Sequence, residues 1–444
     1  MKNKFKYFIV LFAFSLAIVG CSGISPTDEA NLSSTTPTPQ DNQLASLINN
    51  NGLAKLTGPA TETESLVTLG EALFSEIDLS GNKNISCLSC HDTSHGTVDS
   101  LPFSIGTGAQ GVGSARRQIN GESLPTARNA PALYNLGRVN QIRSFLDGRV
   151  SFTNRVVTSS VTEISGSNPS RADIRNVLTN VYDVQPLFPL LSVTEMLGQN
   201  NDLAAHTTEV AVWQSILTDR LLTKPSYVAM FTQAYPATLI TQLNPGHIGR
   251  AIGAFMKTRF QSINSPFDRY LAGELGALTN GQKRGMILFY TRGQCVRCHS
   301  GSNFTDLAFH SSGVPQIGTS PFVDDLGRAG ETGATADRYK FKTPSLRNIA
   351  LTAPYMHDGA FETLEAVVNH YNNIPASLAS YTIPASYRSF YELSLVLDQN
   401  TTRNQLRLNQ IDNRALRNGL GLSEQDKADL VNFLRNGLRD PNFN

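Results

Sequence analysis

The chain has 444 residues, 40% of them hydrophobic, which is enough to bury a core in each of two domains. Its 37 basic and 36 acidic side chains leave a formal net charge of +1, and the basic residues are scattered along the chain. Because nucleic-acid binding needs a basic patch or stripe, this pattern argues against that class of protein.

The first twenty residues have the pattern of an export signal. Three lysines precede an apolar stretch, residues 8–19, that is too short to span a bilayer comfortably. The stretch runs into Gly20-Cys21-Ser22, which resembles a bacterial lipobox, where the cysteine is lipidated. We therefore predict a lipoprotein signal peptide over residues 1–20, lipidation of Cys21, and a periplasmic protein anchored to the outer membrane. An ordinary signal peptide followed by a chance cysteine is the alternative.

The residues after Cys21 are poor in large apolar side chains. From Ser22 to about Gln43 the chain is mostly Ser, Thr, Pro and Asn, a composition that buries too little surface to fold by itself. We assign residues 21–50 to a lipid anchor and a flexible linker.

Four cysteines remain, and they form two copies of the pattern C-x-x-C-H. The copies comprise Cys87, Cys90 and His91, and Cys295, Cys298 and His299. This is the attachment pattern of c-type haem, in which two thiols bond the haem vinyl groups and the histidine ligates the iron. A thioredoxin-like redox pair, a zinc site and structural disulfides compete with this interpretation, but none needs a histidine directly after both pairs. The sequence therefore predicts two covalently bound haem c groups.

Similar segments surround the two motifs. Residues 69–74 precede the first motif and residues 284–289 the second, and both have the apolar spacing of a helix. Thr279 is a candidate N-cap for the second of these helices, and Ser423 with Asp426 can cap an amphipathic helix near the C-terminus. We predict a mostly α fold with two tandem class I cytochrome c-like haem domains.

Five further segments follow one another in a specific order. They are Ala127-Arg128-Asn129-Ala130-Pro131, Phe145-Leu146-Asp147-Gly148-Arg149, Ser265-Pro266-Phe267-Asp268-Arg269-Tyr270, Thr343-Pro344-Ser345-Leu346-Arg347-Asn348 and Leu351-Thr352-Ala353-Pro354-Tyr355-Met356-His357-Asp358-Gly359. In this order they resemble the bacterial dihaem cytochrome c peroxidase and MauG family, from about residue 60 to the C-terminus. The resemblance implies a peroxidatic haem domain over residues 51–270 and an electron-transfer haem domain over residues 271–444.

The resemblance also implies roles for single residues. His91 is expected to be the proximal ligand of the first, peroxidatic haem. Glu195 matches the family's active-site glutamate, which suits proton transfer while the peroxide bond breaks. Asn129, Thr352 and the carbonyl of Pro354 match the positions that hold a calcium ion between the haems.

The second haem departs from the peroxidase pattern. His299 is its expected proximal ligand. Tyr371, fourteen residues beyond His357, stands where the peroxidases have the methionine that serves as the sixth ligand. The MauG branch has a tyrosine there, and a phenolate donor lowers the potential of ferric haem. Met356 is the alternative sixth ligand, and a purely structural role for Tyr371 is another interpretation.

Two more departures concern the first haem and the gap between the haems. Thr107 stands where many peroxidases have a histidine that closes the peroxide site before reduction, so we expect an open site. Leu146 replaces the usual bridging tryptophan, which predicts a different route for electrons between the haems. Residues 374–418 fit the family poorly and have the character of an insertion.

Three functions stay open at this point. The first is a peroxidase that reduces hydrogen peroxide with electrons from a small soluble donor, a cytochrome c or a cupredoxin. The second, which Tyr371 and Thr107 favour, is a MauG-like oxidase of a protein or organic substrate acting through a high-valent dihaem state. The third is an electron-transfer cytochrome without enzymatic activity, against which Glu195 counts. The resemblance also implies a homodimer.

Overall fold

The computed structural model describes residues 36–443 apart from 59–60, 120–124, 139–140 and 320–323. The expected signal peptide, residues 1–20, and the expected lipidation site Cys21 lie outside the described residues. The fold is mainly helical, as predicted, with small sheets. Nothing in the described part of the chain forms a helix with the length and hydropathy that a bilayer crossing requires.

The regular elements are short and evenly spread along the chain. The α-helices are α1 (Pro39–Asn50), α2 (Glu64–Ser75), α3 (Cys87–Cys90), α4 (Ala172–Val177), α5 (Val181–Val184), α6 (Glu209–Ser215), α7 (Pro225–Ala234), α8 (Pro245–Arg259), α9 (Pro266–Leu271), α10 (Asn280–Tyr290), α11 (Ala329–Thr332), α12 (Leu364–Asn372), α13 (Ile374–Ser380), α14 (Thr401–Asn409), α15 (Arg414–Asn418) and α16 (Glu424–Asn432). The strands are β1 (Arg143–Ser144), β2 (Val150–Thr153), β3 (Val156–Thr158), β4 (Phe309–His310), β5 (Ile317–Gly318), β6 (Phe341–Lys342) and β7 (Val396–Leu397). Strands β1, β2 and β3 form one antiparallel sheet, and β4 pairs with β6 and β5 with β7, also antiparallel.

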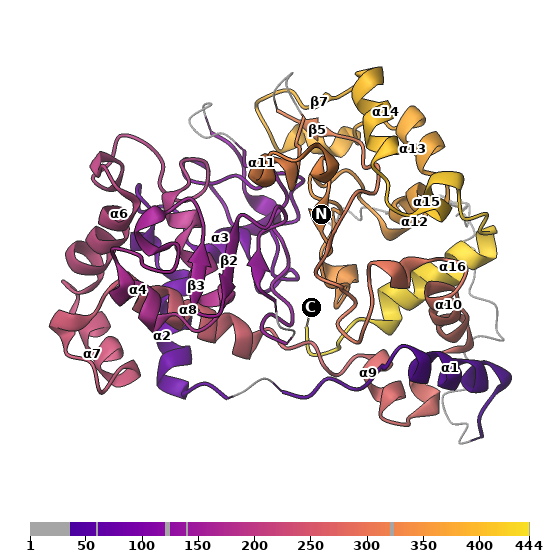
Figure 1. Ribbon diagram of the computed structural model, residues 1–444, viewed down its shortest axis with the longest axis horizontal. Coiled ribbons are helices and arrows are strands. Elements are labelled where there is room, and N and C mark those ends of the chain that lie inside the picture. The colour runs from indigo at the N-terminus through magenta and orange to yellow at the C-terminus, as the bar shows by residue number, and fades with distance from the viewer. Residues whose placement is uncertain (1–35, 59–60, 120–124, 139–140, 320–323, 444) are drawn as a thin grey trace, which may run out of the picture.

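Two separate hydrophobic cores divide the molecule into the left and right halves of Figure 1. The first core is built around α2 and α8, and the second around α10 and α16. Thr279 caps α10 and Ser423 caps α16, each through a capping box, which confirms both predicted caps. The two cysteine motifs therefore belong to two different packing units.

Both halves use the same helix crossing. A Cβ atom on Gly70 of α2 would lie 2.1 Å from the Ala251 carbonyl oxygen of α8, and one on Gly285 of α10 would lie 2.0 Å from the Asp429 carbonyl oxygen of α16. Only glycine permits this close approach of two backbones. In each half the cysteine motif comes after the glycine-bearing helix in the chain.

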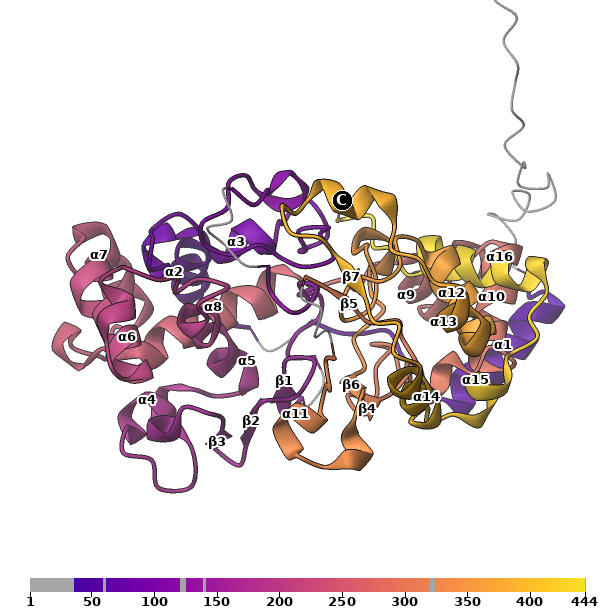
Figure 2. The same cartoon turned by 90° about the horizontal axis from the view of Figure 1, so that it is seen from above.

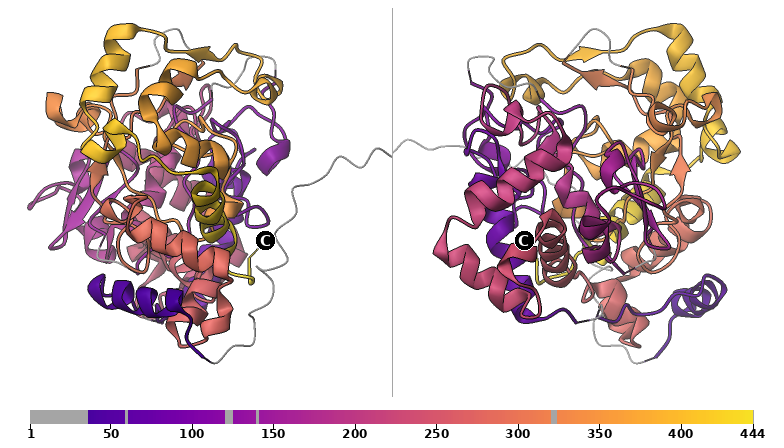
Figure 3. Two further views of the ribbon diagram at one scale, coloured as in Figure 1. Left: turned by 90° about the vertical axis from the view of Figure 1, so that its right-hand side faces the viewer. Right: turned by 60° about the vertical axis from the view of Figure 1, so that its left-hand side comes forward.

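Helix α1 corrects the predicted flexible linker over residues 21–50. Thr38 and Asp41 form a capping box with Pro39 at the first turn, and Leu44 is fully buried in the second core. Asp41 also accepts a hydrogen bond from Tyr270 at 2.6 Å and pairs with the buried Lys283 at 2.8 Å. Composition predicted no structure here because the contacts that hold α1 come from residues more than 200 positions away. Figures 1 and 3 show indigo α1 beside the salmon helices of the second half.

Helix α9 corrects the predicted domain boundary after residue 270. Phe267 and Tyr270 are buried in the second core, whereas the last buried residue of the first core is Phe260. The reason is a fully buried ion pair between Arg347 and Asp268, at 2.6 Å, which fixes α9 to the second half.

The two halves meet along a polar seam. Arg128 of the first half donates to Asp325 of the second at 2.6 and 2.8 Å, and it also binds Asp147. The Leu146 carbonyl accepts a hydrogen bond from the Lys342 amide at 2.7 Å. Leu146, which stands in the sequence where the family usually has a bridging tryptophan, therefore lies at the contact between the halves.

Candidate haem and peroxide sites

The first cysteine motif forms a single helical turn. Ser86 caps α3 with a reciprocal bond to Ser89, and the His91 amide donates to the Cys87 carbonyl at 2.9 Å. The His91 ring is held by a 3.0 Å hydrogen bond between Nδ1 and the carbonyl oxygen of Thr97, a buried residue with φ 62°. With Nδ1 occupied, Nε2 is the nitrogen that can bind a metal.

The second motif repeats this arrangement. The His299 amide donates to the Cys295 carbonyl at 2.9 Å, and Nδ1 of His299 lies 2.9 Å from the carbonyl oxygen of Phe304. Phe304 is fully buried and has a positive φ of 53°. Its counterpart in the first half, Thr97, is also buried and has a φ of 62°. Burial lowers the pKa of both His91 and His299, which keeps the imidazoles neutral and able to ligate.

The residues of both motifs fit c-type haem better than the competing sites. All four thiols are free, so neither pair forms a disulfide. Burial raises the pKa of Cys87 and of Cys295 to about 12, which disfavours the thiolate that a zinc site or a redox pair needs. Within the described ranges, no three His, Cys, Asp or Glu side chains gather so as to hold a metal ion. Two protonated thiols beside an oriented imidazole are the groups that haem attachment uses.

A carboxyl group faces the first motif. Glu195 is half-buried. Burial is the main cause of the raised pKa of Cys87 and of Cys90, and the charge of the nearby Glu195 adds to both shifts. Burial raises the pKa of Glu195 itself, and the nearby guanidinium of Arg149 opposes that shift. The structure therefore brings the predicted catalytic residue to the first motif.

Thr107 lies directly against Glu195. Its amide donates to the Glu195 carbonyl at 2.8 Å, and its hydroxyl donates to Asn84 at 2.9 Å. The threonine hydroxyl is thus already engaged, and it is a poor ligand for iron. The position that closes the site in many peroxidases holds no competing imidazole here.

A phenol faces the second motif. Tyr371 of α12 lies close enough to Cys298 and Cys295 that both thiols raise its pKa, and together with burial, the largest effect, they bring it to about 12. The nearby Ser312 side chain partly opposes this rise in the pKa. Tyr371 therefore lies near the thiols of the second motif.

The neighbouring His370 points elsewhere. Its Nδ1 lies 3.0 Å from the Ser377 hydroxyl and its Nε2 lies 2.9 Å from the Ser312 carbonyl, so both ring nitrogens have partners. Burial lowers the pKa of His370 to about 4. Met356, the alternative sixth ligand, packs in a small cluster with Val314 and Phe361.

The predicted calcium ligands come together only in part. The Asn129 side-chain amide donates to the Pro354 carbonyl at 2.7 Å, although 225 residues separate them. The Thr352 hydroxyl donates instead to the Ile349 carbonyl at 3.1 Å. Calcium binds oxygen atoms, so a calcium ion here requires the Asn129 amide to be flipped, with its oxygen instead of its nitrogen on the side of the Pro354 carbonyl. Calcium binding stays a prediction.

Two residues near the sites were given no functional role in the sequence analysis. Arg149 comes close to Glu195, and His310 lies between Asp306 at 2.7 Å and Asp412 at 3.0 Å. The Asp306 hydrogen bond and contact with Cys298 raise the pKa of His310 to about 10, so it is a cation beside the second motif. No sequence pattern links His310 to Asp412, which is 102 positions away.

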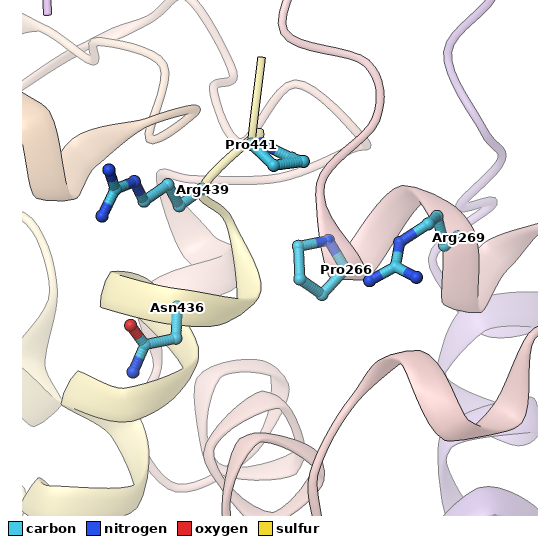
Figure 4. A pocket seen from close by; sticks show the side chains of 5 residues that line it. All are labelled: Pro266, Arg269, Asn436, Arg439 and Pro441. Atoms are coloured by element: carbon cyan, nitrogen blue, oxygen red, sulfur yellow. The ribbon is translucent and has the colours of Figure 1, made fainter. Parts of the chain in front are cut away.

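A surface cavity lies at a different place. It has a volume of about 290 Å³ between α9 and the C-terminal residues, and Figure 4 shows the side chains that line it: Pro266, Arg269, Asn436, Arg439 and Pro441. None of these residues belongs to either cysteine motif. This cavity is therefore not part of the candidate site.

Comparison with known proteins agrees with this geometry. A family profile described as di-haem cytochrome c peroxidase matches residues 64–276. The cytochrome-c peroxidase IdrP2 of Denitromonas iodatirespirans is 30% identical over 69% of this chain and 73% of its own length. The methylamine utilization protein MauG of Methylorubrum extorquens is also 30% identical, over 70% of this chain and 69% of its own.

Solved structures are similar as well. A MauG-like protein associated with microbial copper homeostasis superposes with a TM-score of 0.60 at 26% identity, covering 88% of this chain and 95% of that one. The dihaem peroxidase BthA of Burkholderia thailandensis has the same TM-score at 20% identity, covering 86% and 87%, and supports the fold.

The chain belongs to the dihaem cytochrome c peroxidase and MauG family. Its class is that of the peroxidase-type oxidoreductases, which sets aside an electron-transfer cytochrome without enzymatic activity. The family binds two c-type haems, which agrees with the two motifs of this chain.

Proposed function

We propose that this protein reduces hydrogen peroxide with electrons from a small soluble donor, a cytochrome c or a cupredoxin. The observation that carries the proposal is the carboxyl of Glu195, held beside the thiols of the first motif with a raised pKa. The peroxidase names of the relatives from Escherichia coli and Pseudomonas aeruginosa support the same chemistry.

The first haem would be held by Cys87, Cys90 and His91, and the second by Cys295, Cys298 and His299. Bound haem iron supplies a site for peroxide and the electrons that reduce it. The Thr97 and Phe304 carbonyls orient the two imidazoles and increase their basicity as ligands.

Glu195 would move the proton. Cleavage of the O–O bond requires a proton to leave the oxygen nearer the catalyst and arrive at the oxygen that departs as water. A carboxyl whose pKa is raised by burial holds a proton more readily than an exposed one, which suits it to accept and return a proton. Arg149 limits how far the pKa rises, which keeps the carboxylate form accessible.

A second candidate function is a MauG-like oxidase of a protein or an organic substrate. The observation that favours it is Tyr371, a phenol at the second motif where a thioether would be expected in the peroxidases. As an anionic ligand it would stabilise oxidised states of the second haem relative to a methionine. Its buried phenol, with a pKa near 12, would lose its proton on binding iron.

Calcium at Asn129, Thr352 and Pro354, the lipid anchor at Cys21, the outer-membrane location and the homodimer are further proposals. The contact between Asn129 and Pro354 supports the first of them.

Stopped-flow absorbance tests the proposed function. The diferric protein as isolated is mixed with one equivalent of hydrogen peroxide without reductant, and then again after half-reduction. A fast spectral change in the diferric protein is expected, because Thr107 leaves the first site open. A reaction that occurs only after half-reduction supports peroxidase activity but contradicts the expectation that the first site is open in the diferric protein. No peroxide consumption in either state contradicts the proposed function.

A further inference from the structure

The inserted segment, residues 374–418, reaches across to the first half. Three of its aromatic side chains, Tyr387, Phe390 and Tyr391, pack with Leu101, Phe103 and Ile105 in a small hydrophobic cluster of their own. In Figure 2 the golden ribbon beside β7 lies next to the purple loops of the first half. We call residues 374–418 the cap segment and residues 101–107 the site loop. The cap segment thus touches the loop that follows the first cysteine motif.

One hydroxyl joins the two. The Phe103 amide donates to the Tyr391 hydroxyl oxygen at 2.8 Å, and the same hydroxyl donates to the Phe103 carbonyl at 2.7 Å. Phe103 is 2% exposed and Tyr391 is 6% exposed, so water does not replace these bonds. A side chain from 288 positions away completes both backbone hydrogen bonds of this residue. The contact is reinforced by Arg117, whose guanidinium lies 4.7 Å from the Phe390 ring.

The site loop leads straight to Glu195. Arg116, 1% exposed, donates to the carbonyls of Ile105 and Gly106 and holds the end of the loop. A Cβ on Gly106 would lie 2.0 Å from the Thr194 carbonyl and 2.4 Å from that of Glu195, so the two backbones are in contact. The next residue donates its amide to the Glu195 carbonyl. A shift of the loop would therefore move Glu195.

We propose that the cap segment positions the peroxide site, with Tyr391 as a positioning residue that fixes Glu195 through the site loop. The proposal rests on the proposed function for Glu195 and adds a role for residues 374–418. The chain of contact runs from the Tyr391 hydroxyl through Phe103 to Gly106 and Thr107, and from there to the backbone of Glu195. Preorganisation of this kind matters because a catalytic group displaced by about 1 Å can lose most of its effect.

The test compares two variants of the haem-loaded full-length protein. Tyr391→Phe removes the bridging hydroxyl and keeps the ring in its cluster. Tyr381→Phe is the matched control, since it lies in the same segment and its hydroxyl donates at 2.7 Å to the carbonyl of Ala360 in the second half. Both variants lose one hydroxyl, but only the first loosens the site loop.

Amide hydrogen exchange of residues 101–107 is the first readout. In Tyr391→Phe we expect exchange at least about fivefold faster than in wild type, the factor for one lost buried hydrogen bond. Tyr381→Phe should leave this peptide unchanged. Equal exchange in Tyr391→Phe and wild type overturns the proposal, as does an equal acceleration in the control. This readout does not depend on peroxide turnover, so it decides the contact even if the peroxidase proposal fails.

The second readout is kcat/KM for hydrogen peroxide. Tyr391→Phe should lower it about tenfold with both haems still attached, while Tyr381→Phe keeps the wild-type value. Faster exchange combined with wild-type kcat/KM would overturn the positioning role. If the wild-type protein itself turns over no peroxide, the proposed function fails separately.

Discussion

The two halves hold their histidines in the same way and differ in the titratable side chain that lies near the cysteine thiols. In each, a glycine at the helix crossing brings two helices together, and a carbonyl of a residue with positive φ receives the histidine Nδ1–H. Near the cysteine thiols, the first half has Glu195, whereas the second has Tyr371. A carboxyl can exchange protons, whereas a phenol can serve as an anionic ligand.

This difference teaches that attachment and reactivity are built from separate parts of the chain. The attachment side comes from a helix and the motif that follows it, which are local in sequence. The titratable side chains near the thiols come from a distant loop and from α12. One fold can therefore repeat the residues that attach a cofactor and still give the two cofactors different chemistry.

The halves also differ in what completes them. The second core recruits α1, through Leu44 and the buried pair of Asp41 with Lys283. In the first half the added contact is the cap segment, which packs on the site loop. Each half is thus stabilised by residues that belong to neither haem motif.

The largest effect should come from the carboxyl of the first half. Glu195→Gln keeps the shape of the side chain and removes its ability to carry a proton, so peroxide turnover should fall about 10²- to 10⁴-fold. Steady-state kcat measures this, and the haem content should not change. Glu71→Gln, an exposed residue of α2, is the control. Full activity of Glu195→Gln would remove the proposed difference between the halves.

The phenol of the second half is tested by a spectrum. Tyr371→Phe should remove one axial ligand, so the ferric absorbance and electron paramagnetic resonance signals of the second haem should shift toward five-coordinate iron. Tyr270→Phe is the control, since the Tyr270 hydroxyl lies in the same half but donates to Asp41 at 2.6 Å, away from the cysteine motif. An unchanged spectrum in Tyr371→Phe would exclude Tyr371 as a ligand.

The role of α1 in the second half is tested by a substitution that creates a cavity in its core. Leu44→Ala removes a fully buried side chain and should lower the free energy of unfolding by about 2–5 kcal/mol, measured by urea denaturation. Leu239→Ala, at a side chain that is 67% exposed, should change it by less than about 0.5 kcal/mol. If residues 39–50 were a flexible linker, the two variants would behave alike.

The smallest effect depends on pH. Burial by itself raises the pKa of Asp41, but the hydrogen bonds from Lys283, Thr38 and Tyr270 outweigh it and lower the pKa from 3.8 to about 2. The carboxylate therefore stabilises the fold by about 2 kcal/mol above pH 4, and this contribution is lost as the pH falls from about 4 to 2. The difference in urea midpoint between wild type and Asp41→Asn should be constant from pH 5 to 7 and shrink below pH 4. A gap that stays constant down to pH 2 would contradict the pairing.

The sequence by itself determined what is local. Two C-x-x-C-H patterns identify the attachment groups, and capping residues such as Thr279 and Ser423 fix where helices begin, because these signals act within a few residues. The ordered motifs also sufficed to identify the family. The tyrosine at position 371 was visible as a departure from the peroxidase pattern, and the structure brings it to the second motif.

Only the tertiary structure decided which distant residues meet. It folded residues 39–50 as a helix, assigned α9 to the second core, and brought Tyr391 to Phe103 across 288 positions. Composition cannot reveal such contacts, because their stabilisation comes from burial against partners that are remote in the chain. For the same reason the sequence indicated an insertion at residues 374–418 without a role, and the role emerges from what the segment covers.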